Sequence, residues 1–166
     1  MIINDNNPEE TPAAEGTFFP LFIDMSGRKV LVIGGGDVAG RRIQSLAGCG
    51  AEITVITPAA GDTIEHAASI GMIQLIKRTY TKGDISGLMP FLVIAAAGDR
   101  QINRDVMLES RKLNIPVSVA DCRRECTCCF PAIAENDNYI AALVSKNGDH
   151  SGVKETAKKI REFLDS

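Results

Sequence analysis

The first feature of the sequence that could do chemistry is a run of three glycines at positions 34–36. Together with the next three residues it fits G-x-G-x-x-A, between an apolar segment and a stretch with helical spacing. In such a loop Gly34 permits a tight turn, Gly36 lets backbone N–H groups approach a pyrophosphate, and Ala39 allows close packing of helix on sheet. The pattern predicts a dinucleotide site; the alternative is a glycine-rich turn that holds no nucleotide.

The choice of dinucleotide is less clear from the residues. The second strand of such a site usually ends in an acid that binds the ribose 2′-OH, but here Thr57 and Pro58 stand at that place. No arginine suited to a 2′-phosphate is adjacent in the sequence, and Asp62 further along is more simply interpreted as a solvated loop acid. We favour NAD and leave NADP open.

Two more carboxylates and one amide lie near predicted strand ends. Asp99 follows the small residues up to Ala97, and Asn103 comes one helical turn later. Asp99 is either a helix cap or part of a crevice lined by the cofactor. Asp121 ends a strand that runs from Val117, where it could act as a general base or metal ligand, or form an Asx turn.

Four of the five cysteines form a cluster in the stretch DCRRECTCCF. Their spacing does not repeat the C-x2-C pairs of common zinc sites, and it is no disulfide framework. They are either metal ligands or small buried apolar residues. The members of this cluster are Cys122, Cys126, Cys128 and Cys129.

These residues must be positioned by strands that alternate with helices. Short apolar runs predict strands over 29–33, 52–57, 73–77, 91–96 and 117–120, and helical spacing follows the Gly loop and recurs over 63–70 and 100–113. Continuous apolar strands between helices indicate a parallel sheet covered on both faces. The predicted class is therefore α/β, a Rossmann-like doubly wound sheet.

The last forty-odd residues break this alternation. Two strands, over 130–134 and 139–145, precede one helix that begins at Ser151. A two-stranded unit is not stable alone, so it either packs on the main domain or pairs with a second copy. We expect a homodimer through this segment. The predicted organisation is a disordered tail over 1–16, a cofactor domain over 17–121, a dimerisation segment over 122–148 and a terminal helix over 149–166.

Composition limits the function classes. The chain has 166 residues, 45% of them hydrophobic and 23% charged, and a net charge of −3. This balance argues against a partner that is nucleic acid, and neither a membrane span nor a signal peptide is recognisable. A cytoplasmic location is the expectation.

Three segments, taken in order, resemble a known family. They are FPLFIDMSGRKVLVIGGGDVAGRRIQSLAGCGAEITVITP, FLVIAAAGDRQINRDV and IPVSVADCRRECTCCFPAI. Over about residues 18 to 146 the chain resembles the precorrin-2 dehydrogenase and sirohydrochlorin ferrochelatase family, the N-terminal module of siroheme synthase. The resemblance implies NAD-dependent oxidation of the tetrapyrrole precorrin-2 to sirohydrochlorin, with iron insertion in some members.

The resemblance also implies roles for single residues. Asp121 matches the catalytic aspartate of the family, and the motif at Phe130 begins its dimer-forming segment. The residues implied or predicted to bind the cofactor are Gly34, Gly36, Asp37, Val38, Thr57, Ala97, Asp99 and Asn103. The tetrapyrrole carries many carboxylates, so basic side chains should meet it. The candidates for the substrate are Arg123, Arg124, Lys146 and Ser151.

The sequence departs from the family pattern near its end. In place of the usual G-x-S-P it has Gly148-Asp149-His150-Ser151-Gly152, and one helix stands where relatives have several. Iron insertion, which needs the whole macrocycle enclosed, is the activity most affected. Two other classes stay open: a non-catalytic NAD(H) sensor, and a metal or tetrapyrrole carrier that uses the cysteines.

Overall fold

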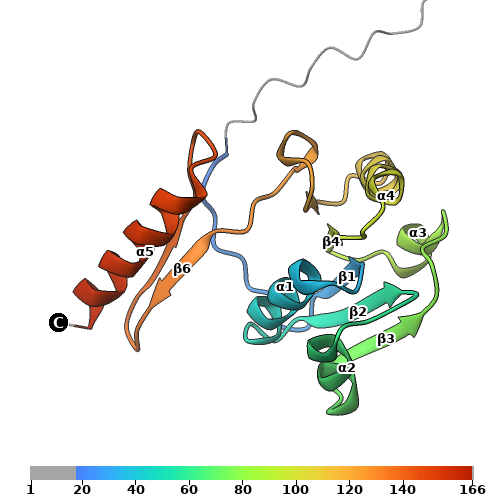
Figure 1. Ribbon diagram of the computed structural model, residues 1–166, viewed down its shortest axis with the longest axis horizontal. Coiled ribbons are helices and arrows are strands. Elements are labelled where there is room, and N and C mark those ends of the chain that lie inside the picture. Colours follow the sequence, from blue (N-terminus) through green and yellow to red (C-terminus); the bar gives the residue numbers. More distant parts are fainter. Residues whose placement is uncertain (1–17, 166) are drawn as a thin grey trace, which may run out of the picture. The chain divides into compact units, whose positions relative to one another are not determined.

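The computed structural model describes residues 18–165, which form two compact units, one ending at Cys128 and the other beginning at Cys129 (Figure 1). The predicted tail over 1–16 lies outside the described residues. The predicted boundary after Asp121 differs from the observed division. Residues up to Cys128 belong with the sheet because Thr127 donates its N–H to the Val117 carbonyl at 2.9 Å and accepts the Val117 N–H at 2.8 Å.

The first unit is a parallel five-stranded sheet with strand order β3-β2-β1-β4-β5. The elements up to the second crossover are β1 (Lys29–Ile33), α1 (Asp37–Ala47), β2 (Glu52–Thr57), α2 (Asp62–Ser69), β3 (Ile73–Lys77) and α3 (Asp84–Leu88). The remaining elements of this unit are β4 (Leu92–Ala95), α4 (Arg100–Lys112), β5 (Val117–Val119) and the 3₁₀ turn η1 (Arg123–Glu125). The order reverses between β1 and β4, so the chain leaves these two neighbours in opposite directions, as doubly wound sheets do at a ligand crevice. The predicted α/β class is confirmed.

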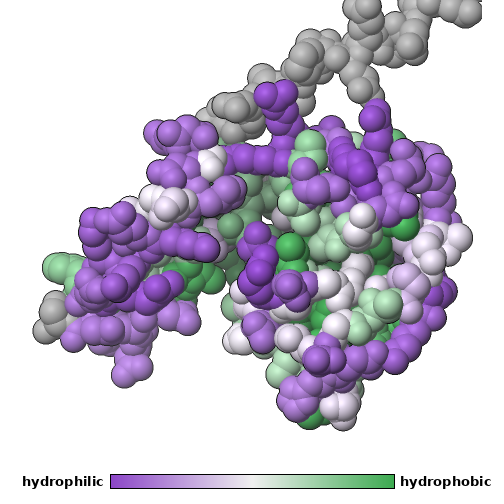
Figure 2. All heavy atoms as spheres, viewed as in Figure 1, coloured by the Kyte–Doolittle hydropathy of each residue, from purple (hydrophilic) through white to green (hydrophobic). Residues whose placement is uncertain are grey.

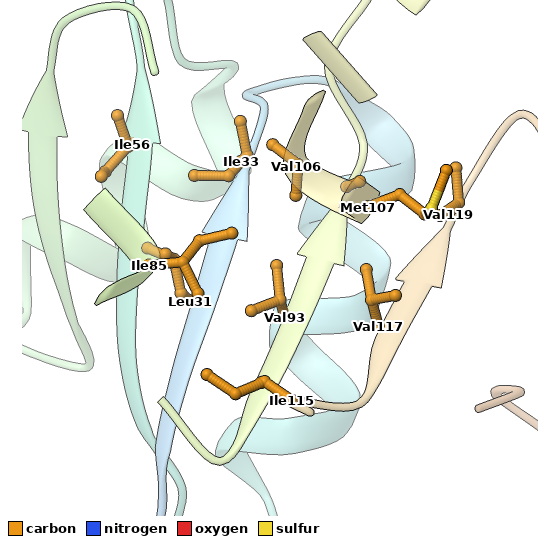
Figure 3. Close-up of a cluster of buried hydrophobic side chains, with 11 residues drawn as sticks. Leu31, Ile33, Ile56, Ile85, Val93, Val106, Met107, Ile115, Val117 and Val119 are labelled. Carbon is orange, nitrogen blue, oxygen red and sulfur yellow. The ribbon is translucent and has the colours of Figure 1, made fainter. Parts of the chain in front are cut away.

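Burial explains why these segments are strands. All four residues of β4 and all three of β5 are buried, as are the last four of β1. Figure 3 shows Leu31, Ile33 and Val93 of the sheet packed with Ile85 of α3 and Val106 of α4. Strand residues alternate between the two faces, so Val30 and Val32, also buried, serve the opposite face. Both faces of the sheet are therefore apolar, and the residues of the site are positioned by a well-packed sheet.

Two short elements were missing from the sequence prediction. The five-residue helix α3 lies between Gly83 and Met89, both with positive φ, and contains Gly87. It is too short to display helical spacing, and Ile85 anchors it in the core with 0% exposure. The other is η1, a single turn with no buried residue.

The second unit is an antiparallel hairpin with one helix. It contains β6 (Ala132–Glu135), β7 (Ile140–Leu143) and α5 (His150–Leu164). Predicted strands over 130–134 and 139–145 were longer, and Pro131, which has no N–H to donate, accounts for the late start of β6. Asp149 accepts the Gly152 N–H at 2.8 Å, so the helix begins at His150, one residue before the prediction.

Contacts within the second unit hold α5 to the hairpin. Arg161 donates to the Ile133 carbonyl at 2.9 Å, and the Asn136 amide donates to the Leu164 carbonyl at 2.6 Å. Ala157 is buried, whereas α5 presents mostly hydrophilic side chains in the view of Figure 2. Over residues 18–165, no helix is long and apolar enough to cross a membrane.

Candidate active site

The Gly loop begins where β1 meets β4. Gly34 has φ +128°, and a Cβ built on it would lie 2.1 Å from the Ala96 carbonyl oxygen. Ala96 in turn donates its N–H to the Ile33 carbonyl at 2.8 Å. Position 34 therefore needs glycine both for its left-handed backbone and for the close approach of the β4–α4 connection.

Gly35, which the sequence pattern left without a role, packs on the loop that follows β2. Its Cβ would lie 2.0 Å from the Ala59 carbonyl oxygen and 2.6 Å from Thr57 Oγ1. The Thr57 hydroxyl donates to Ala59 at 2.7 Å, and Gly61 donates its N–H to the Gly35 carbonyl at 2.9 Å. Thr57 is 3% exposed, so its side chain shapes the loop beneath the Gly loop and has no free face for a ligand.

Gly36 is the open position of the loop. It is the N-cap of α1, no side chain caps the helix, and a Cβ built here would meet nothing within 4 Å. The N-terminal N–H groups of an α-helix lack partners within the helix and carry partial positive charge, which favours an anion. Ala39 is buried and lets α1 pack closely on the sheet. The open N-terminus of α1 at Gly36, Asp37 and Val38 suits the pyrophosphate of a dinucleotide.

A polar cavity of about 260 Å³ opens beside Gly36. Asp37, Arg41 and Gln44 line it from α1, and Asp62 with Thr63 lines it from the start of α2. Its volume suits part of a dinucleotide and not the whole. One expectation is corrected here: an arginine is adjacent in space, because α1 brings Arg41 to the same cavity. Asp62 is exposed on the cavity wall, as expected of a solvated acid. A ribose 2′-OH and a 2′-phosphate each have a suitable partner there.

Asp121 and Asn103 meet at the carboxyl end of β4 and β5. Asn103 Nδ2 donates to Asp121 Oδ2 at 2.9 Å and to the Ala97 carbonyl at 3.0 Å. Asn103 Oδ1 accepts the Ala97 N–H at 2.9 Å, and the residue is fully buried. The amide therefore ties the crevice backbone to Asp121, and its hydrogen-bonding groups are occupied by protein.

The second oxygen of Asp121 belongs to a network that the sequence did not indicate. Arg100 Nη1 donates to Asp121 Oδ1 at 3.3 Å, and its Nη2 pairs with Glu125. The hydrogen bond to Glu125 raises the pKa of the Arg100 guanidinium, so this charge is permanent. The carboxylate of Asp121 thus has one donor on each oxygen while 36% of its side chain stays exposed.

Asp99 is a helix cap in the structure. Its side chain accepts the Gln101 N–H at 2.7 Å at the start of α4. Of the two interpretations that the sequence allowed, the cap is the observed geometry.

The candidates for the substrate divide between the two units. Arg123 and Arg124 lie on η1, and both are exposed. Lys146 follows β7, and Ser151 lies exposed in the first turn of α5. No single unit contains all four.

Cys49, Cys122 and Cys126 form no disulfide. Cys126 accepts the Val119 N–H at 3.1 Å and donates to the Val119 carbonyl at 3.3 Å, which covers the edge of β5. Burial raises the pKa of this thiol, as expected of a small buried apolar residue. In residues 18–165 no three His, Cys, Asp or Glu side chains gather where they could hold a metal ion.

The fold and the Gly loop define a class, a Rossmann-like domain built for a dinucleotide. Residues 21–132 match the family model described as "Putative NAD(P)-binding", and the chain belongs to this family. More particular similarities come from relatives. The chain is 45% identical over 146 residues to the "Probable multifunctional siroheme biosynthesis protein HemA" of Ruminiclostridium josui, covering 87% of this chain and 28% of that protein.

A second relative is the siroheme synthase of Pseudomonas aeruginosa (strain LESB58), 38% identical over 132 residues, or 80% of this chain and 28% of that one. The resemblance drawn from the motifs is confirmed by these matches. The chain spans less than a third of the length of these curated relatives. Among solved structures, "SirC, precorrin-2 dehydrogenase" superposes with TM-score 0.73 at 23% identity, over 87% of this chain and 70% of that one, which supports the fold.

Proposed function

We propose that the protein oxidises precorrin-2 to sirohydrochlorin with NAD as cofactor, as a dehydrogenase of siroheme biosynthesis. The observation that carries this proposal is the Asn103 amide, which joins Asp121 to the backbone of Ala97 at the crevice where the sheet order reverses. That arrangement supports a carboxylate held next to a dinucleotide crevice. The similarity to siroheme synthases supports the choice of substrate.

The residues of the Gly loop would bind the cofactor. Backbone N–H groups of Asp37 and Val38 at the start of α1 are suited to the pyrophosphate, and Gly36 leaves them uncovered. NAD, when bound, supplies a hydride acceptor. The crevice backbone at Ala97 is held by Asn103, so this wall keeps its shape without a ligand.

Asp121 is the proposed general base. Oxidation of a saturated carbon pair removes a hydride and a proton, and an exposed carboxylate at the crevice is suited to accept the proton. Arg123 and Arg124 on η1 come soon after Asp121 in the sequence and are proposed to meet carboxylates of the substrate. Lys146 and Ser151, in the second unit, are proposed separately as contacts for the substrate.

The second unit is proposed to form a homodimer. Its two strands leave unpaired edges, and Tyr139, Ile140, Val144 and Phe163 are exposed large hydrophobic residues. A second copy of this unit would cover them. Sedimentation equilibrium tests the proposal, because a mass of one chain at micromolar concentration contradicts it. A cytoplasmic location belongs to the same proposal, since Cys122 and Cys126 form no disulfide, as in a reducing compartment.

The test of the function is anaerobic absorbance of the protein mixed with precorrin-2 and NAD. Formation of NADH in step with the sirohydrochlorin spectrum is the expected result. Asp121→Ala should lower kcat at least about 100-fold, the usual range for a lost general base, while NAD binding by calorimetry is unchanged. Lys82→Ala, which removes an exposed side chain elsewhere in the first unit, is the control.

The alternatives give different results. Binding of NAD without turnover by the wild-type protein contradicts the dehydrogenase and favours a dinucleotide sensor. If Asp121→Ala keeps turnover, Asp121 is not the general base, and the proposed dehydrogenase activity stands.

A further inference from the structure

Arg100 bridges Asp121 to a second carboxylate. It is the first residue of α4, and its guanidinium donates to Asp121 Oδ1 at 3.3 Å through Nη1 and to Glu125 through Nη2. Asn103 holds the opposite oxygen of Asp121 at 2.9 Å. The carboxylate is therefore fixed at both oxygens, each from α4.

Each of these two donors has a separate effect. Bound by Asn103 alone, a carboxylate at a strand end can pivot about the oxygen that is held. A donor on the other oxygen fixes the plane of the carboxylate and with it the direction of its free lone pairs. Arg100 supplies that second donor, and the exposed part of Asp121 then faces solvent in one orientation.

Glu125 explains why Arg100 stays in place. Its side chain is only 18% exposed, and its Oε2 atom has no hydrogen-bond partner among the described residues. A mostly buried carboxylate requires a cation, and Arg100 pairs with it. Arg111, near the other end of α4, also donates to the Glu125 backbone carbonyl at 3.3 Å. The η1 turn is thus attached to α4 at two points, and Asp121 depends on one of them.

The side chains of Arg100 and Asn103, which contact Asp121, both come from α4. The other titratable groups that interact with Arg100 are Glu125 on η1 and Cys122 directly before it. Lysine would replace Arg100 only in part, because an ammonium is a point charge without the planar pair of donors that reaches two carboxylates at once.

We infer that Arg100 is a positioning residue: it holds the carboxylate of Asp121 in one orientation and is itself held by Glu125. The inference rests on the proposed function, in which Asp121 accepts a proton from the tetrapyrrole. Arg100 does not itself take part in proton or hydride transfer in this role.

The kinetic test uses Arg100→Ala and the double variant Arg100→Ala/Glu125→Gln. The double variant is needed because removal of Arg100 alone leaves Glu125 as an uncompensated charge that can unfold the turn. In the double variant kcat should fall about 10- to 100-fold, the scale of a misplaced catalytic group, while KM for precorrin-2 and for NAD stays within about twofold. Millimolar guanidinium should restore part of kcat, since it can occupy the vacated place.

Conservative variants sharpen the result. Arg100→Lys should keep only part of the wild-type kcat. Glu125→Gln should lose less than Arg100→Ala, and the two changes combined should lose less than the product of their separate effects, because both act through one bridge. Lys112→Ala is the matched control: it removes a cation from the opposite end of the same helix.

A second readout needs no turnover. The Asn103 side-chain NH₂ donates to Asp121 and to the Ala97 carbonyl, so its NMR signals in the cofactor-free protein report on the orientation of the Asp121 carboxylate. They should shift in the double variant and stay in place in Lys112→Ala. This readout distinguishes failure of the inference from failure of the proposed function. A wild-type protein without turnover contradicts the proposed function, whereas the NMR signals still test the orientation of Asp121.

Four results overturn the inference. Three of them are a double variant with wild-type kcat, a loss of kcat that guanidinium does not restore, and Asn103 signals that do not move. A rise in KM for precorrin-2 at unchanged kcat also overturns it, because Arg100 would then be a contact for a substrate carboxylate.

Discussion

Two glycines of the same loop should respond in opposite ways to the same added methyl group. In Gly34→Ala, the new Cβ would lie 2.1, 2.4 and 2.7 Å from backbone atoms of Ala96 and Ala97, at φ +128°. Backbone atoms cannot turn aside as a flexible side chain can. We expect a loss of at least about 3 kcal/mol in the free energy of unfolding, or about 6–12 °C in Tm for a chain of this size.

Gly36→Ala should keep the fold. Its Cβ meets nothing within 4 Å, and the φ of −89° is open to alanine. Alanine is a poorer N-cap than glycine, which costs about 0.5–1 kcal/mol and at most about 4 °C in Tm. The methyl group instead takes the space in front of the N–H groups at the start of α1, and we expect NAD affinity to fall at least about tenfold.

Differential scanning fluorimetry with and without NAD measures both effects in one plate. For the wild-type protein, NAD at about 100 times its Kd should stabilise the fold by about 2.7 kcal/mol, or roughly 5–10 °C. At the same NAD concentration a tenfold weaker Kd should about halve that gain in Gly36→Ala. Calorimetric titration with NAD supplies the Kd itself.

The result that refutes this reasoning is a full NAD-induced shift in Gly36→Ala, since the loop would then not hold the pyrophosphate. A wild-type Tm in Gly34→Ala would contradict the close packing of the loop against the β4–α4 connection.

Two other predictions concern the contact between Tyr80 and Glu109. The hydroxyl of Tyr80 donates to Glu109, and burial, followed by this hydrogen bond, raises the pKa of Tyr80 above its ordinary value. A raised folded-state pKa gives stability that is complete below the unfolded pKa of about 10 and is lost as pH rises beyond it, so Tm should fall as pH rises from about 10 to 12. Tyr80→Phe should flatten that fall, and an unchanged slope in melts across this range speaks against it. Glu109→Ala removes the acceptor of the Gly83 and Ser86 N–H groups, at 3.1 Å each. Urea melts should show a loss of about 2 kcal/mol, whereas Glu155→Ala, which breaks an exposed pair with Lys159, should cost under about 0.5 kcal/mol.

The strands were predictable because a strand that is buried on both faces appears in the sequence as a continuous apolar run. The runs at Lys29–Ile33, Glu52–Thr57 and Ile73–Lys77 are strands with the predicted bounds. Long apolar runs bounded by glycines and polar turns leave few other ways to bury the same side chains. Helix α3 gave no such signal, since five residues with a glycine among them complete little more than one turn.

Much of the site depends on contacts between residues far apart in the chain. Arg100 is 21 residues from Asp121 and 25 from Glu125, and no local spacing connects them. Arg41 reaches the cavity only because α1 and α2 begin side by side at the same edge of the sheet. Sequence patterns indicate the glycine loop and the positions at which strands end. They do not indicate which side chains contact one another at the crevice.

Asn103 has a role that its position in the motif did not predict. The motif predicted contact with the cofactor, yet the amide is buried and bonded to Ala97 and Asp121. One amide thereby sets both the backbone on which the cofactor would lie and the carboxylate that would take the proton. A residue at a motif position can therefore fix the spacing between the backbone that lines a cofactor site and a catalytic group. The separation between hydride acceptor and base would then be set by the fold itself.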